Sequence, residues 1–182
     1  MESGAEFTIP APGTVDVISQ AVAMRSNYRW STAFDITVEG MVRGRPADGS
    51  QTTDYWAGMT INGNLVDSDY VELAAQRDVT PTNNPNCNVV TLTQAGEVVD
   101  NFICSGDPSP WLWHPFKIEW VARQQKVYYW TDKVLRRVRN HTFSGSDVFI
   151  ELTVVSVPIN TPDNGSACEA QYGPLYVWGE KV

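Results

Sequence analysis

Two groups of aromatic side chains carry the clearest binding chemistry in this sequence. Trp111 and Trp113 lie in a proline-stiffened loop, and Tyr128 and Trp130 alternate along a short apolar segment. Sugars stack their apolar C–H faces on such rings and pair their hydroxyls with polar groups nearby. Proline lowers the entropy that the loop loses when it orders around a ligand. These four residues form the candidate ligand-binding set.

The same rings also have a structural interpretation. Trp111 and Trp113 could close one end of a β-sandwich, and most of the other aromatic residues belong in a core. Tyr176 or Trp178 could line the exposed surface instead. The chain has seven Trp, however, which is more than a sandwich of this size needs inside. We therefore expect some of these rings at a surface.

Other kinds of site find little support among the polar residues. The chain has two His, which cannot build a multi-histidine metal site alone, and the cysteine spacing does not fit zinc. Neither a nucleophile elbow nor a phosphate-binding loop is present. Three loops offer hard oxygen ligands of the kind that hold a structural calcium ion. These loops are Asp48-Gly49-Ser50, Asp67-Ser68-Asp69 and Asp163-Asn164-Gly165.

Composition and charge restrict the class of protein. The chain has 182 residues and a formal net charge of -8, which argues against a nucleic-acid partner because phosphate binding needs a basic surface. The apolar runs are too short for membrane insertion. Abundant Gly, Pro and aromatic residues suit an extracellular all-β domain. We expect one domain over 1–182, with a core over 28–180 and an N-terminal strand or extension over 1–27.

Alternating apolar and polar residues predict about ten short strands separated by Pro, Gly, Asn and Asp loops. The expected strands span 34–39, 56–62, 70–75, 89–93, 98–103, 116–121, 127–131, 148–156 and 175–178. Residues 19–25 are the one stretch with some helical character. This spacing of strands and turns predicts a two-sheet antiparallel sandwich or jelly roll.

The cysteines offer a test of one predicted hairpin. If Ala95-Gly96 is a two-residue turn, Gln94 faces Glu97, and the numbers of any two residues that face each other sum to 191. The numbers of Cys87 and Cys104 also sum to 191. This places the two cysteines at a non-hydrogen-bonded pair, where a cross-strand disulfide fits. We favour that disulfide, and with it an oxidising compartment, over two free thiols. Cys168 is then free, or it is the true partner of one of the others.

Two glycosylation sequons and the N-terminus also bear on localisation. The sequons begin at Asn140 and Asn164 and would accept glycan in a eukaryotic secretory pathway. Residues 1–3 show no signal-peptide pattern. We expect a secreted protein in mature form, alone or as part of a larger parent protein.

The segment from His114 to Trp120, followed by Val127 to Asp132, resembles the paired central strands of the concanavalin A-like lectin and glucanase superfamily. Supporting similarity runs over 28–180, at residues 30–38, 55–61, 70–73, 148–155 and 176–178. The resemblance implies a curved two-sheet jelly roll. It implies no single activity, because this fold hosts lectins, binding modules, hydrolases, lyases and adhesion domains.

Laminarinase-like members of this superfamily resemble the chain in the strand from His114 to Trp120, and they carry two catalytic carboxylates on an upstream strand. The corresponding positions here are Asp67, Asp69 and Glu72. A retaining mechanism needs two carboxyl groups about 5–5.5 Å apart. Gly63 to Ser68 reads as a turn, and strand alternation sends Asp69 and Glu72 to opposite faces unless a bulge intervenes. We therefore expect no catalytic cluster, but a loop carboxylate pair and one exposed strand glutamate.

These observations favour a secreted, non-catalytic module that binds a glycan or polysaccharide. The alternatives are a laminarinase-type hydrolase or a polysaccharide lyase, and a structural or adhesion domain of a surface or filament protein without sugar binding. Converging carboxylates would favour an enzyme, and the absence of an exposed aromatic surface would favour a structural domain.

Overall fold

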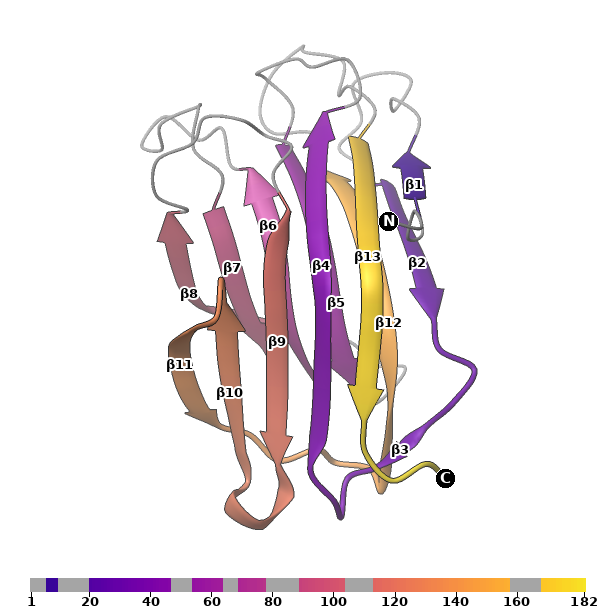
Figure 1. Ribbon diagram of the computed structural model, residues 1–182, viewed down its shortest axis with the longest axis vertical. Helices are drawn as coiled ribbons and strands as arrows, with labels where there is room; N and C mark the ends of the chain where they lie inside the picture. The colour runs from indigo at the N-terminus through magenta and orange to yellow at the C-terminus, as the bar shows by residue number, and fades with distance from the viewer. Residues whose placement is uncertain are drawn as a thin grey trace.

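A computed structural model describes residues 6–9, 20–46, 54–63, 69–77, 89–103, 113–157 and 168–182. Within these residues the chain forms two antiparallel sheets that pack face to face (Figure 1). The first, which we call the front sheet, has the strand order β1-β13-β4-β9-β10-β11. The second, the back sheet, has the order β2-β12-β5-β6-β7-β8, with β3 paired to β12.

The strand bounds of the front sheet are β1 (Glu6–Ile9), β4 (Ile36–Pro46), β9 (His114–Val121), β10 (Lys126–Thr131), β11 (Val134–Asn140) and β13 (Cys168–Trp178). Those of the back sheet are β2 (Gln20–Arg25), β3 (Trp30–Ser31), β5 (Asp54–Asn62), β6 (Tyr70–Arg77), β7 (Val89–Gln94), β8 (Glu97–Ile103) and β12 (Asp147–Val157). In chain order the strands change sheet after β1, β3, β4, β8, β11 and β12. This is the two-sheet jelly-roll sandwich that the strand pattern predicts.

The core lies between the sheets and follows from strand alternation. In β9, residues Phe116, Ile118 and Trp120 are buried, whereas the residues between them are half-exposed. In β6, Val71 and Leu73 are fully buried on the corresponding inner face of the back sheet. Each strand therefore places alternate side chains on an outward face.

The predicted helical character of residues 19–25 is wrong. Gln20–Arg25 is strand β2, which pairs with β12 from Arg25 opposite Glu151 to Gln20 opposite Ser156. Edge pairing with a long neighbouring strand overrides weak local propensity. The one helix among the described residues is the three-residue η1 (Ala122–Gln124), and none there is long enough to span a membrane.

The sequence pattern missed strand β11, which has little apolar alternation. Its side chains are nearly all exposed, so the burial that generates alternation is absent. The strand forms because a two-residue turn at Asp132 and Lys133, both with positive φ, folds it back on β10. Positive φ at both central residues gives the turn twist that suits a hairpin.

The turn at Ala95-Gly96 forms as predicted, but the register beyond it does not. Both turn residues have positive φ, and Gln94 pairs with Glu97. A bulge then leaves Val99 without a partner, so that Leu92 pairs with Asp100. The bulge shifts the pairing by one residue as far as Val89 opposite Ile103. Cys87 and Cys104 lie outside the described residues, so their disulfide stays a prediction.

Candidate functional site

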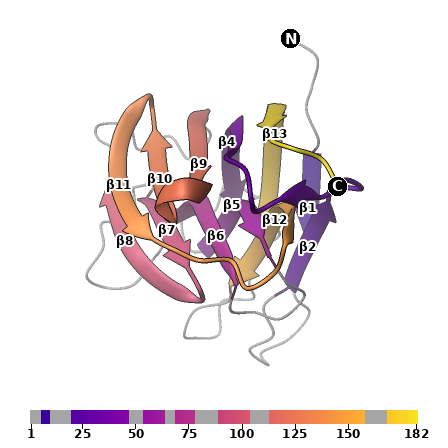
Figure 2. The same cartoon turned by 90° about the horizontal axis from the view of Figure 1, so that it is seen from below.

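The outward face of the front sheet gathers most of the aromatic residues that the sequence singles out. Tyr128 and Trp130 alternate with buried neighbours along β10 and point outward. Tyr176 and Trp178 point outward from β13, with 56% and 52% of their surface exposed. We call this surface the aromatic face and define it by these four residues and Trp113. Figure 2 shows that β10, β9, β4 and β13 lie side by side beneath it.

Strand pairing orders the aromatic face into two rows. One row runs from β13 across β4 and β9 to β10 and consists of Tyr176, Glu39, Lys117 and Trp130. The next row consists of Trp178, Thr37, Glu119 and Tyr128. Aromatic rings thus stand at both ends of a polar centre. Three strand spacings separate β13 from β10, roughly 14 Å at ~4.8 Å per strand.

A charged cluster fixes the Trp130 end of these rows. The Lys117 ammonium lies 4.4 Å from the centre of the Trp130 ring and 3.0 Å from Glu119 Oε1. The Trp130 indole N–H donates to Glu119 Oε2 at 2.6 Å. Cation, ring and carboxylate therefore orient one another. A hollow of about 240 Å³ opens beside Lys117 and Trp130 and is also lined by Glu39 and Lys133.

The Tyr176 end is more open. The rings of Tyr176 and Trp178 stack with centroids 5.9 Å apart and planes 24° apart. Their exposure exceeds that of the half-buried Tyr128 and Trp130, so they offer the larger free ring surface. Trp113 is half-buried beneath the Arg43 guanidinium, 4.4 Å from its ring centre. Trp111 lies outside the described residues.

The outward face of the back sheet has a different character, and Glu72 lies at its centre. The sequence predicted an exposed glutamate here, but Glu72 is only 7% exposed. Its Oε1 atom accepts hydrogen bonds from Trp56 Nε1 at 3.0 Å and from the Thr60 and Thr153 hydroxyls at 3.2 Å. We call this surface the Glu72 face.

A glycine makes room for this arrangement. Gly58 lies diagonally across from Glu72, and a Cβ atom there would stand 2.0 Å from Glu72 Oε1 and 2.7 Å from the Thr153 hydroxyl. The absent side chain allows the carboxyl group to lie against the sheet. A glycine inside a strand pattern often marks such a close approach, and this was the sequence signal that could have revealed the site.

The electrostatics of Glu72 follow from its burial. Desolvation raises the pKa of its carboxyl group above the usual value, and the three hydrogen bonds oppose this only in part. The Glu151 carboxylate raises the pKa further. Thr93 is directly opposite Glu72, and its buried hydroxyl has no hydrogen-bond partner among the described residues. A carboxyl group with a raised pKa beside an unpaired hydroxyl is a chemically distinctive feature.

Asp69 takes no part in the Glu72 face. It is buried on the other side of β6, where its Oδ2 atom accepts from the Ser144 amide at 2.8 Å and the Ser144 hydroxyl at 2.6 Å. His141 Nε2 lies 3.5 Å from its Oδ1 atom, and desolvation lowers the pKa of this histidine. Asp69 therefore anchors the turn before β12. Asp67 lies outside the described residues.

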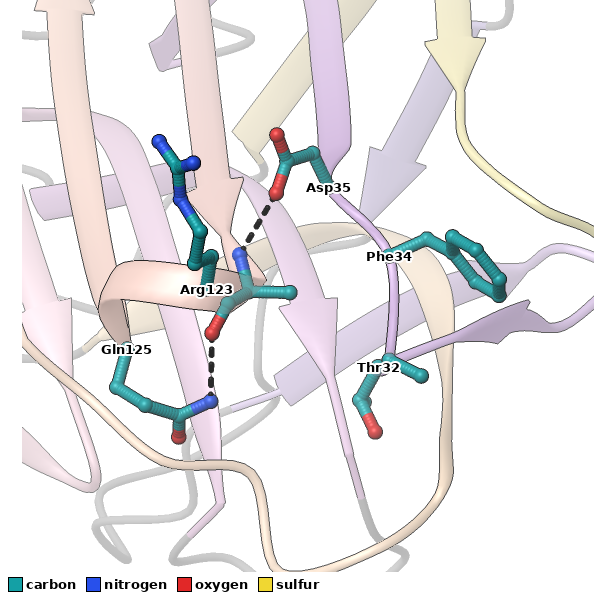
Figure 3. A pocket seen from close by; sticks show the side chains of 7 residues that line it. Thr32, Phe34, Asp35, Arg123 and Gln125 are labelled. Carbon is teal, nitrogen blue, oxygen red and sulfur yellow. Dashed lines mark hydrogen bonds between the residues drawn. The ribbon is translucent and has the colours of Figure 1, made fainter.

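A second hollow, of about 440 Å³, lies beside η1 (Figure 3). Asp35 Oδ1 accepts from the Ala122 amide at 2.8 Å, and the Gln125 side chain donates to the Ala122 carbonyl at 2.8 Å. Phe34 points away from Arg123 in this view. These bonds order the connection from β9 to β10, which is a structural role.

The described residues contain no group of three or more His, Cys, Asp or Glu that could hold a metal ion. Of the predicted calcium loops, only Asp69 falls within the described residues, and its oxygens are used as above. Asn140 of the first sequon is exposed at the end of β11. Asn164 lies outside the described part.

The arrangement of strands is similar to that of several solved structures. The chain is similar to the alginate lyase AlgAT5 of Polysaccharide Lyase family 7, with 13% identity, a TM-score of 0.63, and coverage of 99% of this chain and 79% of that one. An alginate lyase from Pseudomonas aeruginosa gives 12% identity, a TM-score of 0.63, and coverage of 99% and 84%. The carbohydrate recognition domain of Emp47p gives 10% identity, a TM-score of 0.60, and coverage of 96% and 88%.

No protein-family model matches the sequence, and no curated protein matches it. The identities above are low, so the likeness lies in the arrangement of strands. The chain has the concanavalin A-like jelly-roll fold.

Proposed function

We propose that this chain is an extracellular, non-catalytic module that binds a carbohydrate across the aromatic face. The observation that carries the proposal is the pair Tyr176 and Trp178, stacked and more than half exposed on the same face as Trp130. Exposed rings in this number are costly to leave in water and are characteristic of a binding surface. The similar folds include a carbohydrate recognition domain and lyases of a polysaccharide, which supports a sugar as the ligand.

The geometry suits a sugar chain that crosses the strands. Rings at the two ends of each row can stack on the apolar faces of separate sugar units. Between them, Glu39, Lys117 and Glu119 supply charged donors and acceptors for hydroxyl groups. A short oligosaccharide lying along the rows would contact both sets.

A glycan array probed with the isolated chain tests this proposal, followed by titration of the best ligand with Trp178→Ala and Tyr176→Ala. We expect each substitution to weaken binding by about 0.5–1.5 kcal/mol, with little change in melting temperature. Phe34→Ala is the matched control, because Phe34 is 55% exposed but lies in the hollow beside η1, outside the two rows of the aromatic face. Unchanged affinity in both variants would refute the proposal.

A second candidate function is glycan cleavage on the Glu72 face. The observation that favours it is the buried carboxyl group of Glu72, whose pKa is raised and whose Oε2 atom receives no hydrogen bond from the described residues. A carboxyl group poised in this way can transfer a proton. Depolymerisation of alginate or a β-glucan that is lost in Glu72→Gln would support this function over binding alone.

A further inference from the structure

Charge is unevenly distributed along the chain. Residues 117–139 contain seven of the 13 Lys and Arg but only two of the 21 Asp and Glu. This segment therefore carries +5 and the remaining chain -13, which together give the net charge of -8. The segment forms the adjacent strands β9, β10 and β11, so the positive charge collects at one edge of the front sheet (Figure 1).

Four of these seven cations form no ion pair with the described residues. They are Arg123, Lys126, Lys133 and Arg139. The other three are neutralised locally, by Glu119, Asp132 and Asp100. Lys126 and Arg139 lie near the paired ends of β10 and β11, whereas Lys133 lies in the turn between these strands. Unpaired cations that lie close together on an acidic protein create a local positive potential that attracts anions.

Two of the four unpaired cations line one hollow. Lys126 and Arg139 border a space of about 680 Å³ between the edges of the two sheets, where β8 faces β10 and β11. The amides of Gln94 and Asn140 and the exposed apolar side chain of Val98 also line it, and Glu97 is the one acidic residue there. Tyr129 donates to Gln94 Oε1, and Gln94 in turn donates to the Asn140 carbonyl, so this wall is held in place by the sandwich itself.

We infer that the ligand of this module is an anionic polysaccharide, carrying carboxylate or sulfate groups, and that Lys126 and Arg139 hold one of its acidic units in this hollow. The inference rests on the proposed function and specifies its ligand class. The Arg139 guanidinium can form paired hydrogen bonds to a carboxylate or sulfate, and the Lys126 ammonium adds a point charge. Val98 suits the ring of the same sugar unit, and the Asn140 side-chain amide suits its hydroxyls.

The charge distribution favours a single polysaccharide chain over a nucleic acid. A duplex needs a broad basic surface, but the chain outside residues 117–139 carries a net charge of -13. A single glycan chain that crosses the aromatic face as far as β10 can place one end unit in this hollow beside β10 and β11.

Polygalacturonate provides a matched pair of probes, because its methyl-esterified and de-esterified forms share a backbone and differ in charge. We would measure both by affinity electrophoresis and calorimetry over a range of salt concentrations. The wild-type chain should bind the de-esterified form more tightly, and salt should weaken that binding. Lys126→Gln/Arg139→Gln should weaken it roughly three- to tenfold and flatten its salt dependence. Arg29→Gln/Lys181→Gln removes the same charge elsewhere and should not.

Each result decides the inference. Equal binding of the two forms, or equal behaviour of the two double variants, overturns it. If either of these results is found but Trp178→Ala still weakens binding of the glycan, the proposed function stands and only the anionic ligand is refuted. If neither form binds, the anionic ligand is refuted, and the glycan array decides the proposed function separately. Polyglutamate and a single-stranded oligonucleotide serve as competitors. If either competes as strongly as polygalacturonate does, the inference is overturned, because the hollow then selects negative charge and not sugar.

Discussion

The two outward faces of this sandwich use the same strand geometry for opposite purposes. On the aromatic face, large rings stand exposed around a charged centre. On the Glu72 face, small residues such as Ala74 and Thr91 are fully buried and a carboxyl group is enclosed by three donors. The aromatic face exposes its functional side chains to solvent, whereas the Glu72 face buries its carboxyl group. The comparison shows that an outward position in a sheet does not guarantee exposure.

The difference affects how substitutions should be interpreted. A change on the aromatic face alters side chains that contact mainly solvent, so it should affect binding more than stability. A change on the Glu72 face alters a closed hydrogen-bonded arrangement, so it should affect stability first.

Gly58→Ala should have the largest effect. The new Cβ atom would force Glu72 Oε1 and the Thr153 hydroxyl out of their positions, at a cost of about 1–3 kcal/mol in unfolding free energy. Denaturant unfolding measures this cost, and glycan affinity should remain within twofold of wild type. Adding Glu72→Ala to Gly58→Ala should recover part of the loss, and the absence of any recovery would show that the clash is not with Glu72.

Glu72→Gln should change how stability depends on pH. Burial raises the pKa of Glu72 in the folded state, so between about pH 4.5 and the raised value the folded chain holds a proton that the unfolded chain releases. Stability contributed by the protonated group is therefore lost as the pH rises through this window. The amide cannot ionise, so the variant should decline less from pH 4 to pH 8, by about 1.4 kcal/mol for each unit of pKa shift.

Melting temperatures of wild type and Glu72→Gln across that pH range provide the measurement. Asp147→Asn is a suitable control, because Asp147 is a half-exposed carboxylate paired with Arg29 at the start of β12. Parallel curves for wild type and Glu72→Gln would contradict the account of the Glu72 face.

Much of the fold could be predicted because burial leaves a clear periodic trace in the sequence. The alternation in Phe116, Ile118 and Trp120 correctly indicates both strand β9 and its inner face. Strand β11 left no such trace, since its side chains are nearly all exposed. The register of β7 and β8 beyond Thr93 could not be predicted, because the bulge at Val99 depends on local backbone geometry.

The candidate sites show the same division. Alternation placed Tyr128 and Trp130 on one face, and strand pairing then added Tyr176 and Trp178 from a distant part of the chain. Alternation also assigned Glu72 to an outward face but could not reveal its burial. That burial depends on neighbours from two other strands, Thr60 and Thr153, and on the space left at Gly58.

Lys117→Gln should have a smaller effect, confined to the aromatic face. The substitution removes the cation from the Trp130 ring and from Glu119, which lie in a partly exposed setting. We expect a loss of about 0.5–1 kcal/mol in stability at low salt, which high salt should diminish. Chemical denaturation at two salt concentrations measures it, and a loss as large as that in Gly58→Ala would erase the distinction between the faces.

The smallest expected effect is on glucan hydrolysis. Asp69 and Glu72 point to opposite sides of β6 and share no partner among the described residues, so they cannot act as a pair on one glycosidic bond. We expect no release of reducing sugar from laminarin or lichenan by wild type, and the same background in Glu72→Gln. If wild type releases reducing sugar and Glu72→Gln does not, the function is glycan cleavage on the Glu72 face.

The indole N–H signals of the tryptophans test most directly which face binds the glycan. Trp130 and Trp178 belong to the aromatic face, whereas the Trp56 indole donates to Glu72 on the other side of the molecule. Single substitutions to Phe assign the three signals in a ¹⁵N-labelled chain, and the best ligand from the glycan array is then titrated to saturation. If the glycan binds the aromatic face, the Trp130 and Trp178 signals should shift while the Trp56 signal stays in place. A shift of the Trp56 signal with Trp130 and Trp178 unmoved would contradict binding at the aromatic face.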